Sequence, residues 1–492
     1  MIFCVMLKKY FWEGQKMGEK TYGQELSEKL SYTSKNAWEV ATEEDKQRAF
    51  ELAERYKNFL NCAKTEREAV EYFISKAKEN GFSEFEYGCR LKPGDRVYFI
   101  NNNKSILLAV IGKKPLKEGF NLIGSHIDSP RLDLKPKPVY ESNELVFLKT
   151  HYYGGIKKYH WVNVPLSLHG VVVKSDGSKV KIVIGEDEND PVFYITDLLV
   201  HLSSDQLQKK ASEAIPAENL NVLIGSMPFN DEKVKEKVKL NILRILNEKY
   251  GITEEDFISA DIEIVPAAKA RDVGLDRSLI GAYGQDDRAC SFLAAEALFS
   301  INDVPEKTAI VYLVDKEEIG SVGISSAEAS FFDISVARLL KALGEYDNSL
   351  DLAVCFENSA AISGDVAAAL DPTYEGAYDR LNSTLIGHGV TIEKYTGVRG
   401  KYNGSEATAE YVGKIRNFLN SNNICWQTGL LGKVDQGGGG TIAMFIARKM
   451  INVIDSGVPV LSMHSTFEIT SKIDVYMTYR FYREFLKKFK RG

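Results

Sequence analysis

The chain has 492 residues and a formal net charge of -6, from 62 basic and 68 acidic residues. Hydrophobic residues make up 44% and charged residues 26%, which is ordinary globular usage and excludes a fibrous or disordered chain. No basic stripe with interleaved aromatic residues occurs, and no run reaches the roughly 18 apolar residues that cross a bilayer, so we expect neither a nucleic-acid nor a membrane partner.

The cysteines and the N-terminus bear on the cellular compartment. The six cysteines are scattered without a CxxC pair, which favours buried, reduced thiols over a disulfide framework or a zinc knuckle. The apolar start of the chain lacks a basic n-region, a long apolar run and a cleavage site, so it does not predict a signal peptide. We interpret residues 1–16 as a candidate N-terminal extension and expect a cytoplasmic protein.

After this extension the patterns are those of an α/β domain. Apolar residues recur at helical spacing from Thr42 to Asn80, and Gly81 predicts the end of the helix. Short, continuously apolar runs follow, as expected for strands that are covered on both faces. These predicted strands are Arg96–Asn101, Ser105–Ile111 and Gly119–Ser125. The last of them leads into a polar turn.

Between residues 131 and 270 the pattern changes to alternating, strand-like segments. They include Glu144–Phe147, Leu166–Val173 and Val180–Ile184, and a helical stretch rich in Lys and Glu covers Asp231–Tyr250. Period-two alternation of this kind is typical of sheets with one solvated face. We interpret residues 131–270 as an inserted β-rich domain.

An α/β rhythm returns after the insert. We expect a helix over Ala289–Phe299, a strand over Ala309–Val314, and a glycine turn, Gly437–Gly440, before a helix near Thr441. The sequence therefore predicts an α/β fold with a mixed, mostly parallel sheet and helices on both faces. Residues 17–130 and 271–492 would form this main domain, which the insert interrupts.

Two of the seven histidines, His126 and His464, stand where an apolar strand gives way to a turn. Ligands of open α/β sheets bind at the ends of strands, so both positions are candidates for a functional site. Taken alone, either histidine is more simply a capping or core residue.

Carboxylates stand at matching junctions. Asp286 precedes a helix, Glu317 and Glu318 follow a strand, and Asp365 follows another. Each has a purely structural explanation: an N-cap for Asp286, first-turn charges for the glutamate pair, and an Asx-turn for Asp365. Together with the two histidines, however, they match what a hydrolytic pair of metal ions needs, namely imidazoles, shared carboxylates and one more carboxylate as a general base.

Five motifs in the same order resemble those of the M18 metallopeptidases, the family of aspartyl aminopeptidase and aminopeptidase I. The resemblance runs from about residue 20 to the C-terminus, and it implies the fold of the dinuclear zinc exopeptidases. The motifs are Ser125–Pro130, Gln285–Arg288, Asp315–Ser321, Ser363–Asp365 and Ser462–Ser465.

The resemblance implies a centre with two divalent metal ions, in the first place Zn²⁺, with Co²⁺ or Mn²⁺ as alternatives. One ion would be held by His126 and Asp365 and the other by Glu318 and His464, and Asp286 would bridge the two.

The family motifs also imply roles for groups beside the metals. Glu317 would be the general base, and Asp128 would orient the His126 ring through its second nitrogen. The peptide bond between Asp286 and Asp287 is expected to be cis.

The implied activity is that of a metallo-aminopeptidase, which removes the N-terminal residue from short peptides by means of a metal-activated water. Two alternatives from other classes stay open. The chain could be a catalytically silent assembly or scaffold protein of the same fold, or another dinuclear hydrolase such as a deacylase or a carboxypeptidase.

The insert resembles the family's dimerisation domain, which implies a homo-oligomer built from dimers, up to a dodecamer. His169 resembles a histidine that reaches the active site of a neighbouring subunit; a strand histidine satisfied within its own sheet is the alternative. Lys401 and Tyr402 resemble substrate contacts. Asp371-Pro372 stands where aspartyl-specific relatives have His-Pro, so the preferred N-terminal residue (acidic, apolar or broad) is left open.

Overall fold

The computed structural model describes residues 20–490, so the candidate extension over residues 1–16 lies outside the described residues. The chain divides into two compact units, residues 1–35 and 36–492. In the first, helix α1 (Tyr22–Leu30) begins with a capping box in which Thr21 accepts a hydrogen bond from the backbone of Gln24. All further elements belong to the second unit.

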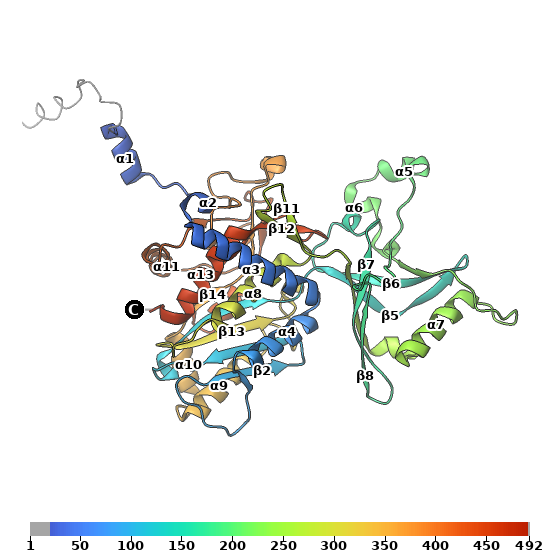
Figure 1. Ribbon diagram of the computed structural model, residues 1–492, viewed down its shortest axis with the longest axis horizontal. Helices are drawn as coiled ribbons and strands as arrows, with labels where there is room; N and C mark the ends of the chain where they lie inside the picture. Colours follow the sequence, from blue (N-terminus) through green and yellow to red (C-terminus); the bar gives the residue numbers. More distant parts are fainter. Residues whose placement is uncertain (1–19, 491–492) are drawn as a thin grey trace, which may run out of the picture. The chain divides into compact units, whose positions relative to one another are not determined.

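The centre of the second unit is a nine-stranded sheet (Figure 1). Five of its neighbouring pairs are parallel and three antiparallel, so the predicted mixed, mostly parallel sheet is confirmed. In spatial order the strands are β1 (Ser83–Glu84), β2 (Arg96–Asn101), β3 (Ser105–Val110), β13 (Thr308–Val314), β4 (Phe120–His126), β14 (Ala360–Ser363), β20 (Asn452–Gly457), β16 (Val390–Glu393) and β18 (Trp426–Thr428).

Helices cover both faces of this sheet, because its strands are apolar on both sides. Ile106 and Leu108 of β3 belong to one hydrophobic core, whereas Leu107 and Ala109, which alternate with them along the strand, belong to the other. The first core receives residues from α3 (Glu43–Cys62), α4 (Glu66–Glu79), α8 (Gln285–Phe299), α11 (Ala409–Ser421) and α13 (Lys472–Lys488). The second receives residues from α9 (Phe331–Leu343), α10 (Ser349–Glu357) and α12 (Ala443–Ala447).

A second sheet of six strands takes all of its strands from within residues 131–266. Its own hydrophobic core includes Val238 of helix α7 (Lys237–Tyr250). The short helices α5 (Ser204–Leu207) and α6 (Ala211–Ala214) also lie in this stretch. In spatial order the strands are β8 (Lys179–Ile184), β7 (Leu166–Val173), β10 (Ala260–Pro266), β5 (Arg131–Ser142), β6 (Leu145–Tyr153) and β9 (Val222–Gly225).

A five-stranded sheet carries two of the segments that matter for the site. Strand β12 comes shortly before Asp286, and β21 shortly before His464. Its order is β11 (Arg271–Val273), β12 (Leu279–Ala282), β22 (Glu468–Ser471), β21 (Pro459–Leu461) and β15 (Ala367–Ala368). The remaining short elements are α2 (Ala37–Val40) and the pair β17 (Gly397–Val398) and β19 (Gly438–Gly439).

Several sequence expectations need correction. The helical pattern from Thr42 to Asn80 forms two helices, because the Thr65 side chain caps a new helix by accepting a hydrogen bond from the backbone of Glu68. Helix α7 begins at Lys237, six residues after the predicted Asp231. Of the cysteines expected to be buried, Cys62 is exposed and only Cys290 and Cys355 are fully buried among the five described. Among residues 20–490, no helix combines the length and apolar character that a membrane crossing requires.

Candidate metal centre

The predicted site residues converge at the carboxyl ends of three adjacent strands. His126 is the last residue of β4 and pairs with Val314, the last residue of β13. The glutamate pair follows β13 in a short 3-10 helix, Glu317–Ile319, and Asp365 follows β14 on the other side of β4. Strand ends that lie side by side in this way bring together residues far apart in sequence, as expected for an open α/β sheet.

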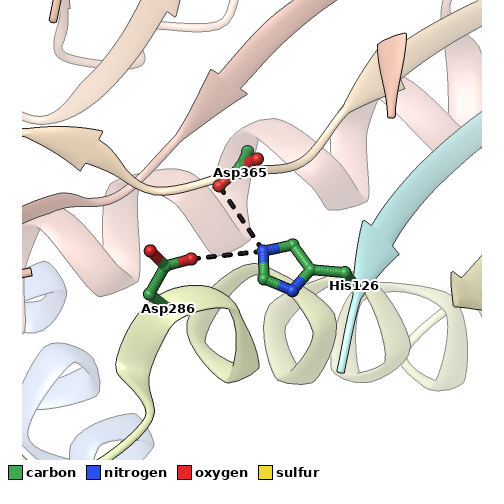
Figure 2. A group of neighbouring side chains, drawn as sticks. All are labelled: His126, Asp286 and Asp365. Atoms are coloured by element: carbon green, nitrogen blue, oxygen red, sulfur yellow. Dashed lines mark ion pairs between the residues drawn. The ribbon is translucent and has the colours of Figure 1, made fainter. Parts of the chain in front are cut away.

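Two groups of possible metal ligands share one carboxylate. His126 Nε2 lies 3.2 Å from Asp286 Oδ1 and 3.8 Å from Asp365 Oδ1 (Figure 2). His464 Nε2 lies 3.1 Å from Asp286 Oδ2 and 3.4 Å from Glu318 Oε2. In each group of three, the ligand atoms lie within 4.8 Å of one another. The two oxygens of Asp286 thus face two different imidazoles, which is the arrangement that a bridging ligand requires.

The other nitrogen of each imidazole ring is already engaged. His126 Nδ1 lies 3.0 Å from the backbone carbonyl of Asp128, and His464 Nδ1 lies 2.8 Å from the carbonyl of Gly155. A carbonyl only accepts, so each Nδ1 must donate, which leaves the Nε2 lone pairs free to bind a cation. Gly155 was not among the predicted site residues, because a backbone carbonyl gives no side-chain signal.

Asp128 contacts both the His126 ring and the segment that carries Glu317 and Glu318. Its Oδ1 lies 3.3 Å from His126 Nδ1, but it is the Asp128 backbone carbonyl that accepts the hydrogen bond from that nitrogen. The carboxylate accepts hydrogen bonds from the backbone of Glu317 (3.1 Å) and of Glu318 (3.2 Å), and from the Tyr153 hydroxyl (2.8 Å). The backbone carbonyl of Asp128 therefore holds the histidine ring, and its buried carboxylate holds the backbone of both glutamates.

Glu468 plays a similar part for the other half of the centre, and the sequence patterns missed it. Its Oε2 accepts hydrogen bonds from the backbone of Gln285 (2.6 Å) and Asp286 (3.2 Å), and its Oε1 accepts one from the backbone of His464 (2.7 Å). In the sequence, only its position four residues after His464 could have pointed to a role of Glu468 in the site. The peptide bond between Asp286 and Asp287 is cis, as predicted.

Burial and crowding of like charges dominate the electrostatics of the centre. Burial, with the nearby carboxylates of Asp365 and Asp128, raises the pKa of Glu317 to about 8. Burial, with Asp286 beside it, likewise raises the pKa of Glu318, one of whose oxygens has no hydrogen-bond partner among the described residues. Burial lowers the pKa of His464, but the hydrogen bond to Asp286 and the charge of Glu318 outweigh it and raise the value to about 11.

Burial also raises the pKa of Asp365, to which the charge of Asp286 contributes. In the described part of the chain, no lysine or arginine forms an ion pair with the three acids of the two groups (Asp286, Glu318 and Asp365) or with Glu317. Acidic groups thus gather in a buried place without lysine or arginine partners, and the donor set of imidazole and carboxylate suits a divalent metal such as zinc.

A cavity of about 700 Å³ opens beside the two groups. Lys401 contributes to its lining, whereas Tyr402 does not and is 69% exposed. The Lys401 ammonium lies 3.9 Å from the centre of the Tyr395 ring and 3.1 Å from Glu406. The substrate contacts predicted for Lys401 and Tyr402 stay predictions.

His169 lies outside this cavity, on β7 of the six-stranded sheet. Its Nδ1 lies 2.8 Å from Glu68 and its Nε2 lies 3.1 Å from Glu186, and the side chain is 2% exposed. Within this chain both ring nitrogens of His169 therefore have acidic partners, which agrees with the alternative of a histidine satisfied within its own subunit. A role in a neighbouring subunit would require it to give up both acidic partners; that role stays a prediction.

Comparisons with known proteins identify the family of the chain. The family model described as "Aminopeptidase I zinc metalloprotease (M18)" matches residues 59–486. A Clostridium acetobutylicum protein described as a probable M18 family aminopeptidase 1 is 50% identical over 456 residues, which are 92% of this chain and 98% of the relative. The chain therefore belongs to the M18 family of zinc metallo-aminopeptidases.

Solved structures of relatives have the same fold. The M18 aminopeptidase of Thermotoga maritima superimposes with a TM-score of 0.89 at 47% identity, covering 93% of this chain and all of that one. Aminopeptidase I of C. acetobutylicum gives 0.87 at 44% identity with the same coverage. The more distant S. cerevisiae mApe1 dodecamer gives 0.71 at 22% identity, covering 89% of this chain and 96% of that one, which shows the fold alone. The chain is thus a metallo-aminopeptidase with the expected fold.

Proposed function

We propose that this metallo-aminopeptidase works with two divalent metal ions per chain, both zinc. The observation that carries the proposal is the position of Asp286, whose two carboxylate oxygens lie 3.2 and 3.1 Å from the Nε2 atoms of His126 and His464. Asp365 would complete the first set of ligands and Glu318 the second. Bound there, the ions would supply Lewis-acid activation of a water molecule and of the substrate carbonyl.

The residues fit such a pair of ions. Both histidines have their Nδ1 atoms held by carbonyls, so their Nε2 atoms point into the centre as neutral ligands. The pKa values of Glu318 and Asp365 are raised by burial and by the charge of Asp286, although the histidines oppose the shifts, and a divalent cation would supply further positive charge. An acid cluster of this kind without cations would otherwise be costly.

Glu317 would be the general base. Its Oε2 lies 4.0 Å from His126 Nε2, at the edge of the first ligand set, and it lines the cavity. Two hydrogen bonds from the adjoining backbone to Asp128 hold this short segment in place. From here its carboxylate would take a proton from the attacking water and later deliver it to the departing amine, the usual double role of a general base.

The substrates would be short peptides with a free N-terminus. The peptide's α-ammonium group would lie against the acidic lining of the cavity, which includes Glu318 and Asp365, and only an N-terminal residue carries this charge.

We further propose that the chain forms homo-oligomers built from dimers, through the inserted domain of residues 131–270. The S. cerevisiae relative described as a dodecamer supports an oligomer in general. Exposed apolar side chains gather in one segment of the insert: Val192, Leu198, Leu199, Val200, Leu202 and Leu207. Such a patch is typical of a protein interface. The free cysteines fit a cytoplasmic location.

The variant Glu317→Gln tests the proposed mechanism. It keeps the shape of the side chain but cannot accept a proton, so kcat on an aminoacyl amide should fall by about 10²–10⁴-fold while bound zinc stays at two ions per chain. Glu328→Gln is the matched control, because Glu328 has a half-exposed side chain whose closest cation is Arg448 at 3.9 Å.

The same assay separates the alternatives. A silent scaffold protein would bind zinc without any turnover in the unmodified protein. A carboxypeptidase or deacylase would cleave substrates whose N-terminus is acylated, and an aminopeptidase would not. Full activity of Glu317→Gln would refute the role of Glu317 as the base.

A further inference from the structure

Glu393 is an acidic residue of the cavity that neither metal group uses. It is the last residue of β16 and stands opposite Asp455 of β20 in an antiparallel pair. Side chains of directly opposed residues lie on the same face of a sheet. Val390 and Ile392 of β16 belong to the core on the other face, so the alternation of the strand turns Glu393 towards the cavity that it lines.

Glu393 has no partner of its own, in contrast to its neighbour. The Thr441 hydroxyl donates a hydrogen bond of 2.6 Å to Asp455. For Glu393, residues 20–490 provide neither a hydrogen bond nor an ion pair. Burial and the charges of Asp455 and Asp365 raise its pKa to about 8. Glu393 therefore stands near two other acids without a counter-cation, and it faces a cavity large enough for a substrate side chain.

The cations that line the same cavity are engaged or stand at its rim. Lys401 is bound to Glu406 and lies over the Tyr395 ring. Lys433 donates a hydrogen bond of 2.7 Å to the backbone carbonyl of Gly376. Arg399 is exposed.

The rest of the lining is partly apolar and includes Val366, Leu430, Met444, Phe445 and Met463. Apolar walls with one acid are suited to a side chain that has a long aliphatic stem and a cationic head. An acidic side chain, in contrast, would meet a second acid, Glu393, in the cavity lining.

We propose that Glu393 selects basic N-terminal residues, lysine or arginine, by pairing with their side-chain cation. The inference rests on the proposed function, because the α-amine must lie at the metal groups for the first side chain to enter the rest of the cavity. Hydrogen bonds to charged groups contribute about 1.5–3 kcal/mol. The pairing should therefore favour Lys over the similarly long, neutral norleucine by roughly 10–100-fold in kcat/KM.

The test compares kcat/KM of the zinc-loaded enzyme on Lys-, Arg-, norleucine- and Asp-amides. In Glu393→Gln, the rates on Lys and Arg should fall by about 10–100-fold while the rate on norleucine stays within about threefold. In Glu393→Lys, the rate on Asp should rise relative to Lys, because the sign of the pocket charge is reversed. Glu375→Gln, on the exposed segment before Arg380, is the control and should not change the order of substrates.

Each other outcome refutes this specificity. Equal losses on all four substrates would mean that Glu393 holds the α-amine, and an unchanged Lys-to-norleucine ratio would mean that it contacts neither group. With either result, the unmodified enzyme would still hydrolyse norleucine amide, so the proposed aminopeptidase function would stand. Absence of turnover on every amide would instead refute the proposed function itself.

Discussion

Two clusters of buried charge in this chain are built in opposite ways. Asp272 of β11 lies 2.6 Å from Lys57, 2.8 Å from Lys472 and 2.7 Å from Arg277. Although burial alone would raise its pKa, these three cations hold it well below the usual range. The candidate metal centre has the reverse balance, since its acids face two histidines and no lysine or arginine among residues 20–490, and the pKa of Glu317 is raised to about 8.

The difference distinguishes a structural acid from a functional one. Around Asp272 the protein supplies the cations itself, so the cluster is complete within the folded chain. At the centre the acids lack this compensation, and they line a cavity through which cations from outside can reach them. Perturbed, uncompensated groups beside a cavity are typical of functional sites. Glu393, which lines the same cavity, is likewise an acid that no lysine or arginine among the described residues compensates.

The largest effect should come from removing the shared ligand. In Asp286→Ala, both groups of ligands lose a carboxylate oxygen, so bound zinc should fall well below two ions per chain. Lewis-acid stabilisation is worth several kcal/mol, and kcat should therefore fall by at least about 10³-fold. Metal analysis and initial rates measure both quantities. Asp303→Ala is the control, since the Asp303 side chain is 82% exposed; two bound ions in Asp286→Ala would contradict the bridge.

The structural cluster should respond in stability and not in zinc content. Asp272→Ala leaves Lys472, whose side chain is 1% exposed, without its acid. Removing one partner of a buried ion pair costs about 3–5 kcal/mol of unfolding free energy, measurable by urea denaturation. Glu54→Ala removes an exposed partner of Lys57 and should cost less than about 1 kcal/mol. Equal effects of the two variants would show that Asp272 is no more important than a surface acid.

The stability of the metal-free protein should depend on pH. Folded Glu317, with its pKa of about 8, keeps a proton that the unfolded chain releases near pH 4.5. Its contribution to stability is thus fully present below pH 4.5 and is lost as the pH rises to about 8. His464, whose pKa is raised from 6.5 to about 11, acts in the same direction above pH 6.5.

Zinc should abolish this loss, because it takes the place of the protons and binds more tightly as the pH rises. At a zinc concentration 100 times Kd, the ion adds about 2.7 kcal/mol. Urea unfolding between pH 5 and 8, with chelator and with zinc, measures the difference. Parallel pH curves under the two conditions would contradict an uncompensated acid cluster.

The sequence predicted the convergence of the candidate ligands better than the residues that hold them in place. Histidines are scarce in this chain, and His126 and His464 both follow an apolar strand, so strand ends were a sufficient guide to their convergence. The supports depend on contacts distant in sequence. Gly155 binds His464 through a backbone carbonyl, and Glu393 meets Asp455 only because β16 pairs with β20. No local pattern contains either contact.

The same limit explains the expectations that changed. The environment of His169 is set by Glu68, which is 101 positions away, so its motif alone could not reveal a satisfied histidine. The break between α3 and α4 was local, and the Thr65 cap was present in the sequence. The apolar residues that recur at helical spacing on both sides of Thr65 hide this break in the sequence pattern.

A smaller effect should come from Asp128, which supports the centre without being one of the proposed ligands. Asn in its place keeps one acceptor oxygen and presents an amide donor to the backbone N–H of Glu317 or Glu318, so one of these hydrogen bonds is lost. Changes to groups that orient metal ligands cost about 10–100-fold in metal affinity or activity, and we expect this loss in Asp128→Asn, measured as zinc Kd and kcat.

Tyr153→Phe is a milder change at the same carboxylate, because it removes only the hydroxyl that donates a hydrogen bond of 2.8 Å to Asp128. The net value of one such hydrogen bond to a charged group is about 1.5–3 kcal/mol at most, and the carboxylate keeps its two backbone donors. The phenylalanine variant should therefore lose less zinc affinity than Asp128→Asn. If the order were reversed, the support would come from the Tyr153 ring and its contact with Arg131, 3.8 Å from the ring centre, and not from the carboxylate.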